Sequence, residues 1–399
     1  MKVLLVTNQY IDIRNGECYC NFALHGTLEN MSVLGDLYIV SNKQLPDKPA
    51  AQPLNKKINF ISAQHVKHFK PTNRGVFSFL GNYINNRRLL NDLIPDMDLV
   101  IGYSPSINSD LALRISHKNH IPFLTFLVGC TWDALHNHHR LLARIMAPIS
   151  WYTTRKTVKK SEYVHYVTKE FLQRRYPSKG KTLGCSDINL SNINKNILIE
   201  RLENSSTLNS GRFIKLVTTA NIDVRYKGQE YVIRAIAKLK ESGDIRYHYY
   251  LLGAGKGQYL KELTKKLGIE DQIHFEGRKK PEEVISTLVN SDIYLQPSLQ
   301  EGLPRAVVEA MSVALPCIGF NTGGMFELLE SEFVVPQKSI DEIINCLKKL
   351  QNIEKYQKTA EYNFQKSCEY EHSLLTSQIR EFFKEIRIEI ENEYDSKIN

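Results

Sequence analysis

The stretch that decides the fold lies at residues 291–330 and reads SDIYLQPSLQEGLPRAVVEAMSVALPCIGFNTGGMFELLE. Its pattern predicts a strand, a loop and a helix, followed by a second strand, loop and helix. Ile293–Leu295 is a short apolar strand that ends before Pro297, because proline cannot donate to a strand ladder. Pro304 suits the first turn of a helix, where its missing N–H costs nothing. Small and apolar residues then recur at helical spacing. The stretch is therefore typical of part of an α/β sheet.

Two carboxylates are set into this frame. Glu301 lies in the loop after the first strand, and Glu309 lies inside the following helix. Ligands of open α/β sheets bind beyond the carboxyl ends of the strands, and a helix N-terminus there favours an anion. Carboxylates beside such an anion would accept hydrogen bonds from a ribose or a hexose. A solvated loop glutamate and a helix-surface glutamate explain the same spacing, so spacing alone leaves both interpretations open.

The wider pattern carries a family resemblance. The run Glu301-Gly-Leu-Pro-Arg-Ala-Val-Val-Glu309, preceded by Pro297-Ser298 and followed by Gly323-Gly324, resembles the E-x7-E signature of retaining GT-B glycosyltransferases of family 4. The resemblance implies an α/β fold of the GT-B type, with two Rossmann-like doubly wound domains that face a cleft. It also implies a C-terminal helix that crosses back to the first domain.

Length and pattern agree with two domains. The chain has 399 residues, of which 42% are hydrophobic, enough for two ordinary cores. Strands and helices alternate along it, which favours parallel doubly wound sheets. We expect an acceptor-side domain at residues 1–205, joined by the C-terminal helix at about 376–399, and a donor-binding domain at 206–375. The polar segment 189–210 is expected to be the linker between them.

Lys227-Gly228 follows a strand and precedes a helix in the second domain. Lysine is a compact cation suited to phosphate, and glycine allows close backbone approach. In the resembled family a lysine-glycine at this place holds the donor diphosphate. Many members also have an arginine five residues earlier, where this chain has Ile222; we expect Arg225 to substitute. The resemblance further implies donor contacts from Gly302, Leu303 and Pro304.

The first domain is less clear. Gly16 lies where the family has a loop against the donor phosphates, but an ordinary turn explains it equally well. At the position of the family's acceptor-side residue this chain has Cys130, and Asp133 three residues later is the preferred candidate. The catalytic candidates are therefore Glu301, Lys227 and Asp133.

Other motifs are read as structural. Gly253-Ala-Gly255 lacks the third glycine of a dinucleotide fingerprint, so we interpret it as a strand-to-helix turn. The histidines of His136-Asn-His138-His139 do not share one helix face, and no cysteine or carboxylate completes a ligand set. Asp96-Met-Asp98 leads into a strand and resembles a metal-binding D-x-D only superficially. We expect no metal and no cofactor.

Charge is concentrated in the first half of the chain. The net charge is +9, from +11 in residues 1–200 and −2 in residues 201–399, and the segment 140–181 has eleven basic and two acidic residues. Such a face attracts anionic lipid. No nucleic-acid motif accompanies it, and a merely soluble basic surface remains the alternative.

Nothing in the sequence indicates secretion or a membrane span. The N-terminus, MKVLLVTNQY, is typical of a first strand rather than of a signal peptide, and no long apolar run occurs. The seven scattered cysteines indicate reduced thiols. We expect a cytoplasmic protein, bound peripherally to the inner face of the plasma membrane if the basic segment contacts lipid.

Together these features predict a retaining, metal-independent hexosyl- or N-acetylhexosaminyltransferase. The donor would be a UDP- or GDP-sugar, and the acceptor a glycan or a polyprenyl-diphosphate-linked glycan. The runs Tyr226-Lys-Gly and Glu301-Gly-Leu-Pro-Arg-Ala resemble enzymes of bacterial capsule, O-antigen or exopolysaccharide assembly. A nucleotide-sugar epimerase of the same fold and a non-catalytic nucleotide-sugar-binding partner are the alternatives.

Overall fold

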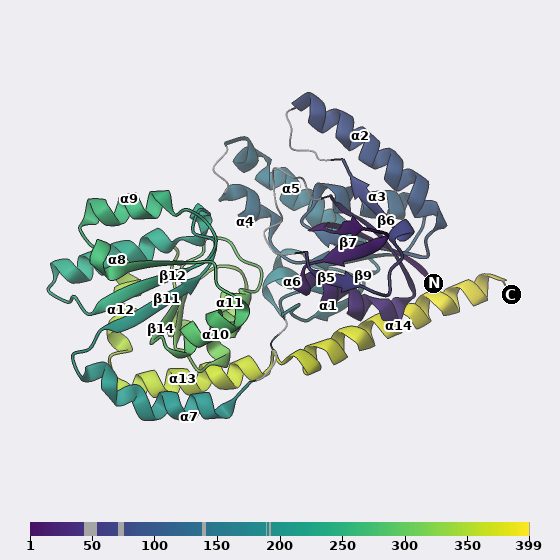
Figure 1. Ribbon diagram of the computed structural model, residues 1–399. Coiled ribbons are helices and arrows are strands. Elements are labelled where there is room, and N and C mark those ends of the chain that lie inside the picture. The colour runs from purple at the N-terminus through teal and green to yellow at the C-terminus, as the bar shows by residue number, and fades with distance from the viewer. Residues whose placement is uncertain (44–53, 71–75, 138–140, 189, 191–192, 399) are drawn as a thin grey trace. The chain divides into compact units, whose positions relative to one another are not determined.

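The computed structural model describes residues 1–43, 54–70, 76–137, 141–188, 190 and 193–398, and the chain divides into two compact units. The first unit comprises residues 1–132, 148–189 and 373–399; the second comprises residues 133–147 and 190–372. Each unit is built on its own parallel sheet (Figure 1).

The sheet of the first unit has seven strands within the described residues, in the order β10-β9-β8-β7-β1-β4-β6. Its strands are β1 (Lys2–Tyr10), β4 (Asp36–Asn42), β6 (Val66–Phe69), β7 (Leu99–Ser104), β8 (Phe123–Leu127), β9 (Tyr163–Tyr166) and β10 (Lys181–Gly184). The central strand β1 pairs with β4 and β7, and its run Val3–Val6 is fully buried. A continuous apolar run is what a parallel strand covered on both faces requires.

The remaining elements of the first unit surround this sheet. A small antiparallel sheet joins β2 (Asp12–Arg14), β3 (Glu17–Cys20) and β5 (Lys56–Ile58). The helices are α1 (Phe22–Met31), α2 (Val76–Leu93), α3 (Ile107–Lys118), α6 (Phe171–Arg175) and the C-terminal α14 (His372–Ile398). Helices α4 (Thr131–His136) and α5 (Leu141–Lys160) each contain residues of both units. Strand β5 pairs antiparallel with β3, with Cys18 opposite Ile58.

The second unit has a six-stranded sheet within the described residues, in the order β13-β12-β11-β14-β15-β16. Its strands are β11 (Ile214–Thr219), β12 (Tyr247–Leu252), β13 (Ile273–Gly277), β14 (Ile293–Gln296), β15 (Cys317–Phe320) and β16 (Val334–Val335). Its helices are α7 (Lys195–Asn204), α8 (Gln229–Glu241), α9 (Gln258–Leu267), α10 (Pro281–Val289), α11 (Arg305–Ser312), α12 (Ile340–Lys349) and α13 (Ile353–Cys368). Helix α8 packs against α9 and α12, whereas α11 packs against α10 and α13 (Figure 1).

Both sheets are doubly wound, because in each the chain starts at the centre, adds strands on one side and then returns to the other side. The predicted fold class, two Rossmann-like α/β domains, is confirmed. The decisive stretch also folds as expected, as β14, α11 and β15. One detail differs: Pro304 is the N-cap of α11 rather than a residue of its first turn.

The expected linker at 189–210 is wrong. Asn189 and residues 191–192 lie outside the described residues, but the rest of the segment contains α7, which packs on α13. The composition is polar, yet Leu198 and Leu202 contact the core residues Ala360 and Phe364. Tertiary packing therefore makes a helix where the Asn- and Ser-rich composition indicated an irregular connection.

Candidate functional site

The candidate site lies at the topological switch point of the second sheet. Strands β11 and β14 are parallel neighbours, with Leu216 paired to Ile293. From β11 the chain continues through α8 to β12 on one side, and from β14 it continues through α11 to β15 on the other. Ligands of open α/β sheets bind at the carboxyl ends of the two strands from which the chain diverges in this way.

The loop after β11 carries Lys227 at the end of a short 3-10 helix, η5 (Arg225–Lys227). The next residue, Gly228, has φ 71° and ψ 13°, a left-handed conformation. A Cβ atom at this position would lie 1.9 Å from the carbonyl oxygen of Pro297, in the loop after β14. Glycine is therefore required here, both for its backbone conformation and for the close approach of the two loops.

Lys227 and Glu301 meet across these two loops. Lys227 Nζ lies 2.7 Å from Glu301 Oε1, and the two side chains are 22% and 12% exposed. The side-chain amide of Gln296 donates to the same carboxylate oxygen at 2.9 Å. The structure thus brings together a cation and a carboxylate that the sequence could only place on separate loops, in surroundings largely shielded from water.

Behind Glu301 lies a polar group that sequence reasoning missed. Tyr294 Oη donates to Gln296 Oε1 at 2.7 Å, and Gln296 Nε2 also donates to Ser298 Oγ at 2.9 Å. All three residues are buried. The signal that could have found them is their place at the carboxyl end of a switch-point strand, but in the sequence Gln296 only marks where that strand ends.

The loop between Glu301 and α11 is held by its backbone. Gly324 N donates to Gly302 O at 2.7 Å, from the 3-10 helix η7 (Gly323–Glu327) that follows β15. Leu303 and Pro304 are buried, and Pro304 begins α11 as its N-cap. The predicted donor-loop residues therefore lie in a rigid connection between β14 and α11, and their contact with a donor stays a prediction.

Glu309 occupies a different environment from Glu301. Its residue is only partly exposed, and burial raises the pKa of its carboxyl, with Arg305 opposing the shift. Within the described residues no hydrogen bond or ion pair engages this carboxylate. Burial, and to a lesser extent the charge of Glu309, raises the pKa of the Tyr294 phenol, which indicates that Glu309 lies near β14.

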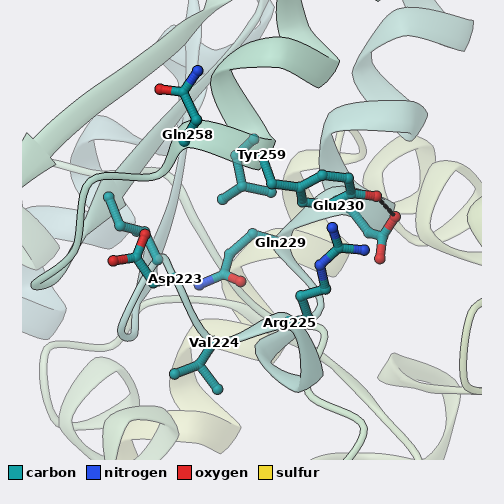
Figure 2. A pocket seen from close by; sticks show the side chains of 9 residues that line it. Asp223, Val224, Arg225, Gln229, Glu230, Gln258 and Tyr259 are labelled. Atoms are coloured by element: carbon teal, nitrogen blue, oxygen red, sulfur yellow. Dashed lines mark hydrogen bonds between the residues drawn. The ribbon is translucent and has the colours of Figure 1, made fainter. Parts of the chain in front are cut away.

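Arg225 is held beside a small cavity of ≈ 90 Å³ (Figure 2). Its guanidinium lies over the ring of Tyr259, 3.8 Å from the centroid, as a cation–π contact. The hydroxyl of Tyr259 donates to Glu230 Oε2 at 2.7 Å. Arg225 therefore has a defined orientation over Tyr259, and its substitution for the family's arginine stays a prediction.

The glycine loop after β12 is a turn, as interpreted from the sequence. Gly253, Gly255 and Gly257 all have positive φ. The N–H groups of Lys256 and Gly257 donate to the carboxylate of Asp223, at 2.8 Å for the shorter bond to Gly257. These bonds hold the pKa of Asp223 below its usual range. The loop amides thus bind a side chain of the protein.

The candidates from the first half of the sequence, Gly16, Cys130 and Asp133, are less informative. Gly16 and Asn15 both have positive φ in the two-residue turn between β2 and β3, which is the conformation of a type I′ hairpin. The turn alone accounts for this glycine, and its donor contact stays a prediction. Cys130 is buried, with Arg175 Nη1 3.0 Å and Tyr176 Oη 3.3 Å from its sulfur. Asp133 lies in the first turn of α4, and its acceptor role also stays a prediction.

Within the described residues no group of three or more His, Cys, Asp or Glu side chains is arranged to hold a metal ion. His138 and His139, of the histidine run weighed above, lie outside the described residues. None of the seven cysteines forms a disulfide. Among the described helices none is both long enough and apolar enough to cross a membrane.

Comparison with known proteins identifies the second unit. Residues 205–367, which contain the whole candidate site, match the model of the glycosyl transferases group 1. Protein CapJ of Staphylococcus aureus is 28% identical over 257 residues, covering 64% of this chain and 63% of CapJ. WcaL of Salmonella typhimurium, a putative colanic acid biosynthesis glycosyltransferase, is 27% identical over 184 residues, covering 44% of this chain and 45% of WcaL. The chain thus spans less than two thirds of either relative.

Solved structures extend the likeness of the fold to the whole chain. The complex of Anabaena HepE with UDP matches with a TM-score of 0.60 at 16% identity, covering 96% of this chain and 99% of that one. WaaG, a glycosyltransferase involved in lipopolysaccharide biosynthesis, matches with a TM-score of 0.61 at 14% identity and the same coverage. The group 1 domain at residues 205–367 is therefore the second half of a GT-B fold, as the sequence predicted.

Proposed function

We propose that this protein is a glycosyltransferase that moves a sugar from a nucleotide-diphosphate sugar to a glycan or lipid-linked acceptor in bacterial surface polysaccharide synthesis. The observation that carries the proposal is the Lys227–Glu301 pair at the switch point of the group 1 domain, 2.7 Å apart. The names of its relatives, which refer to capsule and colanic acid, support the assignment to polysaccharide synthesis. Solved structures of the same fold that contain UDP and UDP-glucose support a nucleotide-sugar donor.

The proposed donor contacts follow from charge. The diphosphate is an anion, and Lys227, Arg225 and the N-terminus of α8 supply positive potential on one loop. As the nucleoside diphosphate departs, its growing negative charge is stabilised by these fixed groups. In this proposal Lys227 turns from Glu301 to the phosphates, so the ion pair of the unliganded site is exchanged for a pair with the donor.

The two glutamates would bind hydroxyl groups. Glu309 has a desolvated carboxylate that no described group hydrogen-bonds, and ribose hydroxyls would supply the missing donors. Glu301 would accept from a hydroxyl of the donor sugar, a hexose or an N-acetylhexosamine. The proposed transfer retains the anomeric configuration, requires no protein nucleophile and no metal, and lets the departing phosphate take the acceptor proton.

Nucleotide binding tests the phosphate assignment. UDP and GDP are titrated by calorimetry into the wild type and into Lys227→Ala. We expect at least tenfold weaker binding in the variant, because a lost charge-assisted hydrogen bond is worth about 1.5–3 kcal/mol. Lys256→Ala, in the neighbouring glycine loop, is the matched lysine control. If wild type and Lys227→Ala bind UDP and GDP with equal affinity, the assignment of Lys227 to the phosphates is wrong.

Turnover separates the alternatives. Nucleotide sugars are screened for release of the nucleoside diphosphate with and without polyprenyl-diphosphate-linked acceptors. A transferase releases it together with acceptor glycosylation, an epimerase converts the donor with no acceptor, and a binding partner does neither. Asp133→Asn is expected to lower the rate with acceptor while leaving donor affinity unchanged, if Asp133 serves the acceptor.

We also propose that α5 docks on an anionic membrane, where a lipid-linked acceptor would reside. The helix has five basic residues and no acidic one. Apolar side chains along it are exposed, and most of them follow helical spacing on one face: Leu141, Leu142, Ile145, Met146, Ile149 and Tyr152. Each basic residue near an anionic surface contributes roughly 1 kcal/mol, and the apolar side chains would enter the interface.

Vesicle cosedimentation tests this contact with phosphatidylglycerol and with phosphatidylcholine vesicles. Ile145→Glu and the triple change of Lys156, Lys159 and Lys160 to Gln should each reduce binding to the anionic vesicles several-fold. Ile388→Glu, at an equally exposed isoleucine of α14, is the control. Binding that persists in both α5 variants would refute the docking.

A further inference from the structure

A buried chain of hydrogen bonds ends on the carboxylate of Glu301. Thr219 N donates to Tyr294 Oη at 3.4 Å, Tyr294 Oη donates to Gln296 Oε1 at 2.7 Å, and Gln296 Nε2 donates to Glu301 Oε1 at 2.9 Å. Tyr294 is 0% exposed and Gln296 is 2% exposed. Both side chains are therefore fixed by the surrounding core.

The chain has one consistent direction. Tyr294 Oη accepts from the backbone N–H of Thr219, lies 3.1 Å from Thr219 Oγ1, and donates its hydrogen to Gln296 Oε1. The other end of the amide must then be the NH₂ group, which can only donate. A carboxylate can only accept. The chain of hydrogen bonds therefore presents an N–H donor to Glu301 Oε1.

The two oxygens of Glu301 are used unequally. Oε1 accepts from both Lys227 and Gln296, whereas Oε2 has no hydrogen bond to any described residue. When a diphosphate draws Lys227 away, Gln296 is the remaining contact on Oε1. Lysine has a flexible stem and can move between the two partners, but the buried glutamine cannot follow.

We propose that Gln296 is a positioning residue: it holds the Glu301 carboxylate in place, with Oε2 directed to a hydroxyl of the donor sugar, once Lys227 binds phosphate. This inference rests on the proposed function, and it assigns Gln296 to recognition of the sugar and not of the nucleotide. Its loss should therefore weaken binding of the nucleotide sugar far more than binding of the nucleoside diphosphate.

The experiment compares two affinities in each variant. UDP and UDP-glucose, or GDP and GDP-mannose if the wild type prefers guanine, are titrated by calorimetry. Gln296→Leu should bind the nucleoside diphosphate within twofold of the wild type and the nucleotide sugar about tenfold or more weakly, the range of one lost hydrogen bond to a charged group. Gln272→Leu, at a buried glutamine that bonds to Ile245 O and Tyr247 O instead, should leave the ratio of the two affinities unchanged.

Each outcome decides a separate point. Equal losses for both ligands, or no loss for either, would overturn the role of Gln296 while leaving the proposed function intact. A wild type that binds neither nucleotide would overturn the proposed function and this inference with it. Should Gln296→Leu fail to fold, Tyr294→Phe keeps the volume and removes the donor to Gln296; we expect a threefold or greater selective loss of the nucleotide sugar. An unchanged ratio in that variant would likewise overturn the proposal.

Discussion

Replacing Arg201 should destabilise the second unit strongly, although the residue lies in a segment that looks like a linker. Arg201 is 9% exposed on α7. Its guanidinium donates to the carbonyl oxygens of Val313 at 3.0 Å, Ser291 at 2.8 Å, Val289 at 3.0 Å and Leu288 at 3.3 Å, and to Tyr356 Oη at 3.2 Å. These carbonyls lie at the C-terminal ends of α10 and α11, where helices leave such groups without partners and favour a positive charge.

The magnitude follows from what Arg201→Met leaves behind. The change removes a buried cation, which by itself would relieve desolvation. The carbonyl oxygens, however, belong to the backbone and cannot be replaced. Leu288 O also accepts from Ser291 N. The carbonyl oxygens that lose their donor in the variant are therefore those of Val313, Ser291 and Val289. A buried unsatisfied group costs about 1–3 kcal/mol; allowing for partial relaxation, we expect a loss of about 3–5 kcal/mol.

Thermal and urea unfolding, followed by circular dichroism, measure this loss. The expected change corresponds to roughly 10 °C in the transition of a domain of this size. Lys358→Met, which breaks an exposed ion pair with Glu354 on the same unit, should change stability by less than about 1 kcal/mol. If Arg201→Met unfolds within about 1 kcal/mol of the wild type, the carbonyls are satisfied by other means and the reasoning is refuted.

Three further predictions concern a glycine, a buried histidine and a buried aspartate. Gly228→Ala should weaken nucleotide binding and destabilise the protein more than Gly268→Ala, measured by calorimetry and urea unfolding. Both positions have similar positive φ, but only the Cβ at 228 meets another backbone atom; the control should lose only about 1–2 kcal/mol. Burial lowers the pKa of His165 to about 4. As the pH falls, this histidine is therefore protonated in the unfolded state before it is protonated in the folded state. This term should remove about 2 kcal/mol of stability between pH 7 and pH 5. His165→Phe should lack it, and an unchanged pH slope would contradict the assignment. Burial raises the pKa of Asp110 to about 6. The contribution of Asp110 to the free energy of unfolding therefore has the opposite pH dependence, and falls as the pH rises through 6. Asp110→Asn should therefore gain stability relative to wild type at pH 7 compared with pH 4.

The fold could be predicted because its determinants are local. Buried parallel strands appear as short apolar runs, and the helices between them have their own periodicity. The stretch at 291–330 contains one such repeat together with the two glutamates, so its strand, loop and helix follow directly. Lys227-Gly228 was likewise predictable, because a left-handed glycine before a helix leaves a recognisable pattern.

The remainder depends on contacts between distant segments. Arg201 lies in a segment whose composition indicates a solvated linker, and it is buried only because α7 packs into the second unit. Gln296 and Tyr294 belong to a strand in which any buried residue fits the pattern; their role arises from Thr219 on β11 and Glu301 beyond the strand. No spacing rule within one segment can indicate the hydrogen bonds that form between two distant segments once the sheet brings them together.

The two glutamates of one motif consequently differ in what they require from a ligand. Glu301 is already paired with Lys227 and Gln296, so a donor must offer Lys227 a better anion before it gains access to the site. Glu309 is desolvated, with its pKa raised by burial, so it gains from any hydroxyl that reaches it. A free sugar supplies hydroxyl groups for the glutamates but no anion for Lys227. Inorganic diphosphate supplies the anion but no hydroxyl groups. Only a ligand that joins a diphosphate to hydroxyl groups on both sides meets both requirements, and the proposed nucleotide-sugar donor is such a ligand.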